Sequence, residues 1–341
     1  MTKGRVALEL LAPAGLVAVV GVVGSFTSNA TAIYFQTALV SVAVVVALYV
    51  FVGNSGVLSF GQVSFAALGA YTAGIMSVPA DSKAGILPDV FPLLRDHTVS
   101  NAASFALATA VGALFSLFAG AALMRLSGLA AGIATFAVLE ITHNILQQWT
   151  KIGPGPGTLS SIPEASGMLQ VTVGALVVVV VASGYQRSRL GRQLRATRED
   201  AAAAQAVGIS VHRQRLWAFV LSGGLSGFAG ALYVHEIGTL TSNDLYLELT
   251  FLSLAMLVVG GATSLWGAVV GALAISGLNS FLGQAESGVN IGFTLDLPTG
   301  KRLVAVGALM AAVLILRPSG ITGGREFSLR WLAMWRKESA A

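Results

Sequence analysis

Long apolar runs alternate with short polar segments along almost the whole chain. An α-helix needs roughly 20 mostly apolar residues to cross the hydrocarbon core of a bilayer. About ten runs approach that length, at residues 8–27, 33–52, 57–78, 102–124, 129–149, 169–186, 214–234, 248–262, 264–284 and 302–317. The eighth is short and the ninth follows almost without a turn, so this pair is expected to be a broken or re-entrant unit. The pattern predicts an all-α, polytopic integral membrane protein with one transmembrane domain over residues 1–341.

Composition and charge placement agree with this prediction and orient it. Hydrophobic residues make up 55% of the chain and charged residues 10%, whereas a soluble domain carries about 25% charge. If the N-terminus is cytoplasmic, most Lys and Arg fall inside, as membrane topology favours. They are Lys3, Arg5, Arg125, the seven arginines from residue 187 to residue 215, Arg317, Arg325, Arg330, Arg336 and Lys337. Both termini are then cytoplasmic, and residues 318–341 form a cytoplasmic tail.

The first apolar run has two interpretations. Lys3 and Arg5, an apolar stretch and Ala30-Thr31-Ala32 resemble a secretory signal with its cleavage site. The stretch is long for a signal core, and Glu9 and Pro13 interrupt its start. We therefore expect a retained first helix, although cleavage would leave the topology of the rest unchanged.

The longest predicted cytoplasmic loop, residues 187–213, contains a helix. Residues 192–207 are Ala-rich without Pro or Gly, and Gly208 is placed to end the helix. One face is expected to carry small or apolar residues, namely Leu194, Thr197, Ala201 and Ala204. Arg195 and Glu199 can pair across one turn. Such a helix lies either on anionic headgroups or against a cytoplasmic partner. The Ala-rich face favours the partner, because lipid anchoring would favour Leu, Phe or Trp.

Several kinds of chemistry find no support in the sequence. Cysteine is absent, which excludes disulfides and thiol chemistry, and four dispersed histidines argue against zinc. No G-x-x-x-x-G-K-[ST] segment occurs, so the chain lacks that phosphate-cradling loop. We therefore expect no cofactor, no metal and no catalytic residue. The net charge of +5 requires no nucleic acid, because its placement is topological and membrane lipid is the natural partner.

Five blocks, in order along the chain, resemble the permease family for branched-chain amino acids, of the LivM type, in ABC importers. They are Ser59-Phe60-Gly61-Gln62 with Gly69-Ala70-Tyr71-Thr72, Arg125-Leu126-Ser127-Gly128 with Thr135 and Glu140-Ile141, Glu199-Asp200-Ala201-Ala202 with Gly208, residues 216–233, and residues 258–272 with the tail Arg317-Pro318-Ser319-Gly320. The resemblance implies a multi-pass subunit of a bacterial inner membrane. Its partners would be a second permease subunit, two cytoplasmic ATP-binding subunits and a periplasmic or extracellular solute-binding protein.

The third block resembles the loop that couples such permeases to their ATPases. The resemblance implies that coupling residues are Arg192, Arg195, Glu199, Asp200, Ala201 and Gly208. Asp200 departs from the family's Glu-Ala-Ala form. The outer loop 152–158 also departs, because prolines replace the usual Thr-Gly-Gly turn. That second departure leaves the cargo open among branched-chain amino acids, urea, short amides and aromatic acids, all carried within the wider family.

The fifth apolar run carries a polar face. At about 100° per residue, one side of the helix holds Glu140, His143, Asn144 and Gln147. An ionisable group near the bilayer centre costs about 2.5–3.5 kcal/mol on insertion scales, so this face should point into the bundle or a wet cavity. It is either an interhelical polar clamp or a lining of the substrate path. Ser59 and Gln62 are further path candidates, with helix packing through hydrogen bonds as the alternative.

Two other classes of protein share single features with this sequence. Gly53-Asn54-Ser55-Gly56 matches the G-x-S-G of intramembrane serine proteases. A serine nucleophile needs a nearby base, but the predicted topology separates Ser55 from His143 by most of a bilayer, so Ser55 is predicted to start a helix. A stand-alone channel or secondary transporter would favour buried charge pairs, yet Glu9 and Glu140 have no obvious basic partner. The sequence favours the permease subunit, with ATP hydrolysed elsewhere.

Overall fold

The structure is a computed structural model that describes residues 3–163, 167–286, 289–290, 294–295, 301–317 and 319–327. Its helices are α1 (Lys3–Ser25), α2 (Asn29–Ser55), α3 (Gln62–Ser77), α4 (Ala80–Ile86), α5 (Pro92–Arg95), α6 (Asn101–Leu123), α7 (Gly128–Gln148), α8 (Met168–Arg187), α9 (Arg189–Glu199), α10 (Ala201–Ala206), α11 (Val211–Ile237), α12 (Leu247–Gly260), α13 (Leu265–Glu286) and α14 (Lys301–Leu316). Two short strands, β1 (Val289–Asn290) and β2 (Thr294–Leu295), pair antiparallel.

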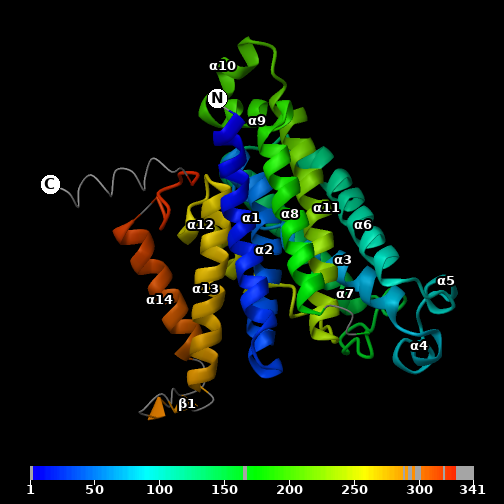
Figure 1. The fold of residues 1–341 in the computed structure, drawn as a ribbon. Coiled ribbons are helices and arrows are strands. Elements are labelled where there is room, and N and C mark those ends of the chain that lie inside the picture. Colours follow the sequence, from blue (N-terminus) through cyan, green and yellow to red (C-terminus); the bar gives the residue numbers. More distant parts are fainter. Residues whose placement is uncertain are drawn as a thin grey trace.

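The long helices run side by side in one bundle (Figure 1). Helix α11 packs against α2, α3 and α6 in the middle of the bundle, while α1 and α8 pack against α2. Residues 38–52 of α2 are almost entirely buried, apart from the half-buried Ser41. Figure 1 places α9 and α10 at one end of the bundle and α4, α5 and β1 at the other.

Six of the described helices are long and apolar enough to cross a membrane: α2, α6, α7, α8, α11 and α13. Helices also occur at the other predicted places, but α3, α12 and α14 have fewer residues than a typical span. The 14 residues of α12 extend over about 21 Å at 1.5 Å per residue, short of a core of about 30 Å. An all-helical membrane protein is confirmed, and the full set of ten spans stays a prediction.

Glycines let the central helices touch backbone to backbone. A Cβ built on Gly230 of α11 would lie 1.9 Å from the carbonyl oxygen of Ala66 in α3, and one on Gly227 would lie 2.3 Å from that of Ala108 in α6. Small residues are the usual means of close helix approach in membranes. Gly223 and Gly227 of α11 thus form a close-packing surface. The similarly spaced Gly128 and Gly132 of α7 do not, since a Cβ on either would meet nothing closer than 3.7 Å.

Two predictions about the start of α3 are wrong. The helix begins at Gln62 rather than near residue 57, so Ser59 lies in the irregular connection between α2 and α3 instead of on a helical stripe. Ser55 ends α2 rather than starting a helix, and the C-cap Gly56 adopts the left-handed conformation with φ +69°. The Ser55 hydroxyl accepts a hydrogen bond from the Val57 amide at 3.1 Å. The segment Gly53-Asn54-Ser55-Gly56 is therefore the C-terminal end of α2.

Candidate functional site

Helix α9 is anchored to the ends of two long helices. The Arg195 guanidinium donates to the carbonyl oxygen of Gln186, in the last turn of α8, at 2.7 Å. The Arg198 guanidinium donates to the carbonyl oxygen of Gly53, in the last turn of α2, at 2.7 Å. Cationic donors suit the C-terminal ends of helices, where carbonyls lack intrahelical partners. The charged side chains therefore join α9 to the bundle.

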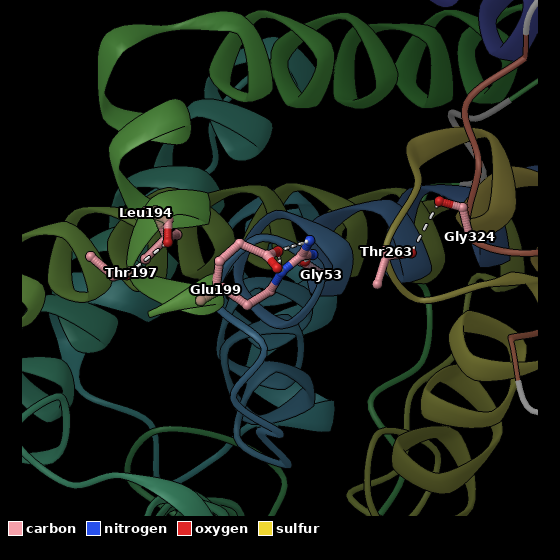
Figure 2. Close-up of polar contacts among 7 residues, drawn as sticks. Gly53, Leu194, Thr197, Glu199, Thr263 and Gly324 are labelled. Atoms are coloured by element: carbon pink, nitrogen blue, oxygen red, sulfur yellow. Dashed lines mark hydrogen bonds and ion pairs between the residues drawn. The ribbon is translucent and has the colours of Figure 1, made fainter. Parts of the chain in front are cut away.

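Arg198 also forms an ion pair with the next residue in the chain. It pairs with Glu199 at 2.8 Å, and its side chain is 24% exposed against 73% for Glu199. Figure 2 shows Glu199 close to Gly53, with Thr197 and Leu194 on the same helix. The predicted pair between Arg195 and Glu199 does not form, because Arg195 is engaged by α8 and Glu199 by Arg198.

The predicted single helix is broken at Asp200. This residue is extended, with φ −151°, and its carboxylate caps α10 by accepting from the amides of Ala202 and Ala203. The physical reason is that a short acidic side chain competes well for free amides at a helix start. The break also disrupts the predicted face, since Leu194, Thr197 and Ala204 are buried but Ala201 is exposed.

Gly208 ends α10 as expected. Its φ of +85° lies in the left-handed region, and its amide donates to the Gln205 carbonyl. A Cβ at this position would meet no atom within 4 Å. The surface around α10 is open, with Ala202, Ala203 and Val207 exposed. Arg192 is exposed too and donates to the Arg187 carbonyl oxygen at 2.5 Å.

The polar face of α7 meets the segment that leads into α12. The Tyr246 hydroxyl donates to the Glu140 carboxylate, and the Asn144 amide donates to the same carboxylate at 2.9 Å. The rings of His143 and Tyr246 stack at 3.6 Å with an interplanar angle of 5°. His143 Nδ1 lies 3.1 Å from the Ser242 carbonyl oxygen. Gln147 approaches Asn243 at 3.5 Å, so all four predicted residues meet residues 242–246 directly or, for Asn144, through Glu140.

Aromatic rings continue this face toward the end that carries α9. The Phe60 ring lies 6.1 Å from that of Phe136 on α7 and 6.0 Å from that of Phe251 on α12, both in edge-to-face geometry. Phe136 and Phe251 are 36% and 53% exposed. The surface between α7 and α12 is thus polar around Glu140 and aromatic around Phe60.

Comparison with known proteins identifies the family. The model of the family described as "Branched-chain amino acid transport system / permease component" matches residues 29–316.

The chain belongs to this family.

Individual relatives are distant. The high-affinity branched-chain amino acid transport system permease protein LivM of Salmonella typhimurium is 24% identical over 308 residues, covering 80% of this chain and 65% of the relative. The autoinducer 2 import system permease protein LsrC of Klebsiella pneumoniae is 29% identical, covering 51% and 53%. The probable permease protein LivH of Methanocaldococcus jannaschii is 32% identical, covering 44% and 47%. The chain thus spans just under two thirds of the LivM relative. No solved structure matches it.

The other two path candidates of this permease-family chain lie together, but inside the protein. Ser59 donates to the Gln62 side-chain oxygen at 2.5 Å, and the two residues are 1% and 2% exposed. The Gln62 amide nitrogen is buried without a hydrogen-bond partner among the described residues. The neighbouring Phe60 amide donates to Thr135 of α7 at 3.2 Å. The pair therefore lies beneath the aromatic part of the α7–α12 surface.

The sequence interpretation missed three contributors to these sites: Tyr246, Arg198 and Phe60. Tyr246 is distant from Glu140 in sequence, and no local pattern indicates that contact. Arg198 was one arginine among seven in its loop, with nothing to single it out. Across the described residues, no three His, Asp or Glu side chains gather as metal ligands do.

Proposed function

We propose that this chain is the membrane-spanning permease subunit of an ATP-driven ABC importer. One observation carries the proposal beyond family membership. Helices α9 and α10 lie at one end of the bundle, are joined to α2 and α8 by Arg198 and Arg195, and leave their far surface exposed. A helix anchored on one side and open on the other is suited to receive force from a separate ATP-binding subunit.

The proposed topology has ten crossings with both termini in the cytoplasm of a bacterial cell. Residues 319–327 contact the α12–α13 turn, near the end of the bundle that carries α9. Lys83 belongs to the opposite end, in α4. Its ammonium donates to the carbonyl oxygens of Leu94 and His97, at 2.9 and 2.5 Å, and burial lowers its pKa. A buried lysine held by local carbonyls fits an outer segment better than an anionic membrane surface.

The coupling roles follow from this arrangement. Arg195 holds α9 to α8, while Glu199 supports the Arg198 side chain. Asp200 and Gly208 define the two ends of α10, so that Ala201 and its exposed neighbours can contact the ATP-binding subunit. Arg192 lies on the exposed side of α9. The remaining partners are a second permease subunit and a solute-binding protein on the outer side.

The proposed substrate path follows the surface between α7 and α12. Glu140 and Tyr246 form its polar part, and Phe60, Phe136 and Phe251 form its apolar part. A carboxylate beside aromatic rings suits an ammonium group attached to a hydrocarbon side chain. A branched-chain amino acid has both features, which supports that cargo over urea, short amides and aromatic acids.

Reconstitution tests the proposal directly. The chain would be placed in liposomes with its second permease, its ATP-binding subunits and its solute-binding protein, and uptake of labelled leucine, urea, acetamide and benzoate measured with and without ATP. We expect ATP-dependent leucine uptake that falls in Glu140→Gln. The control Gln148→Ala changes an exposed position of α7 and should behave as wild type. Uptake without ATP would instead indicate a channel or secondary transporter, and normal uptake in Glu140→Gln would indicate a polar clamp.

A further inference from the structure

Residues 319–327, which we call the strap, cross the turn between α12 and α13. The Ile321 amide donates to the Val259 carbonyl oxygen at 2.7 Å. The Thr322 amide and hydroxyl both reach the Gly260 carbonyl oxygen, at 3.2 and 2.7 Å. Figure 2 shows a further contact, in which the Thr263 hydroxyl donates to the Gly324 carbonyl oxygen at 3.1 Å. The strap is therefore held to this turn by its backbone.

Glu326 joins the strap to the start of α13. One carboxylate oxygen accepts the Leu265 amide at 2.8 Å, and the other accepts the Trp266 amide at 3.2 Å. These amides are among the four that a helix leaves unpaired at its N-terminus, and a carboxylate there also interacts well with the helix dipole. The Phe327 and Trp266 rings lie 5.2 Å apart.

The same carboxylate reaches the base of α9. Gln186 of α8 donates its side-chain amide to Glu326 at 2.8 Å, and its backbone carbonyl accepts from Arg195 at 2.7 Å. Arg195, Gln186 and Glu326 thus form a continuous hydrogen-bonded link from α9 to α13. A capping role alone would not require the contact with Gln186.

The other end of the α12–α13 unit bears on the proposed path. Tyr246, the N-cap of α12, donates to Glu140, and Phe251 of α12 faces Phe60. Gly260 and Gly271 let α12 and α13 pack backbone to backbone, because a Cβ on Gly271 would lie 2.0 Å from the Met256 carbonyl oxygen. The close packing therefore gives a continuous contact from the start of α13 to the residues beside Glu140.

We propose that Glu326 is a positioning residue that transmits movement of α9 to the α12–α13 unit and so to the path. This inference rests on the proposed function and adds a transmission route to it. In its simplest form, the Arg195–Gln186–Glu326 link makes α8, α9 and α13 respond as one unit when an ATP-binding subunit pushes on α9.

The test compares transport with ATP hydrolysis in the reconstituted full assembly. Glu326→Ala removes the shared carboxylate. Arg325→Ala is the matched control, because the Arg325 side chain is exposed and makes no hydrogen bond or ion pair among the described residues. We expect Glu326→Ala to assemble with the ATP-binding subunits and hydrolyse ATP, while the solute moved per ATP falls at least about tenfold, the effect of losing one strong charged hydrogen bond. Arg325→Ala should keep the wild-type ratio.

A second variant separates transmission from folding. Gln186→Ala leaves the helix cap of α13 intact but breaks the link to α8, so it should lower the same ratio. The double variant Gln186→Ala with Glu326→Ala should move no less solute per ATP than Glu326→Ala alone, because both changes interrupt one route. A wild-type ratio in Gln186→Ala, or additive losses in the double variant, would overturn the inference. If even the wild-type chain failed to bind ATP-binding subunits, the proposed function itself would fail, which is a distinguishable result.

Discussion

Arg198→Ala should loosen α9 from the end of α2. In the folded chain the guanidinium donates to the Gly53 carbonyl oxygen at 2.7 Å, and a Cβ on Gly56 would meet the Arg198 stem at 2.7 Å. A hydrogen bond from a charged group contributes about 1.5–3 kcal/mol. The C-terminal end of α2 adds about 0.3–1 kcal/mol for a nearby cation.

The combined loss is about 2–4 kcal/mol. At 1.4 kcal/mol per factor of ten, α9 should separate from α2 about 30 to 700 times more often. Hydrogen exchange of the α9 backbone amides reports this opening directly. The protein assembled in nanodiscs would be compared with Glu199→Ala, which removes only an exposed ion pair whose contribution is about 0–1 kcal/mol.

We expect faster exchange at α9 in Arg198→Ala, together with less solute moved per ATP, while Glu199→Ala should leave the exchange at α9 near wild type. Arg198→Lys should be intermediate, because an ammonium on a flexible stem replaces the planar guanidinium. If Arg198→Ala and Glu199→Ala show equal exchange at α9, then the contact with Gly53 does not hold this helix and the reasoning is refuted.

Three further changes test other parts of the structure. Gly230→Val should force α11 away from Ala66 and lower the free energy of unfolding of the purified chain by about 3 kcal/mol. Gly277→Val should not, because a Cβ at Gly277 would meet no atom within 4 Å. Equal melting temperatures for the two variants would contradict the packing. Lys83→Met should speed proteolysis between residues 79 and 99, because two carbonyls lose a charged donor; an unchanged cleavage rate would show that this lysine holds nothing. Gly208→Val should strain α10 by about 1–2 kcal/mol and raise its amide exchange; wild-type exchange would mean that the left-handed turn is not needed.

Much of the fold was predictable because lipid imposes a simple rule. A membrane helix must be long and apolar, so helices were found at each predicted place. The orientation that the Lys and Arg distribution predicts stays a prediction. The helix boundaries failed where short polar contacts decided them. The Asp200 cap divides α9 from α10, and the irregular segment before Gln62 shortens α3.

For the candidate sites, the sequence predicted which residues share a helix face but not their distant partners. The spacing of Glu140, His143, Asn144 and Gln147 was enough to place them on one face, because helical periodicity is local. The partner Tyr246 comes from a segment about a hundred residues away, and only the folded chain brings it there. Gly53 and Arg198 show the same limit, since the sequence predicted that Ser55 starts a helix while the structure shows a helix end that receives an arginine.

The most direct test of the account is co-purification of the tagged chain from mild detergent, with the ATP-binding subunit quantified. The surface of α10 is altered in Ala202→Trp, and Ala122→Trp makes the same change at an exposed position near the end of α6. We predict that wild type and Ala122→Trp retain the ATP-binding subunit and that Ala202→Trp loses it. Equal recovery from all three, or a chain that purifies alone, would contradict the docking role of α9 and α10.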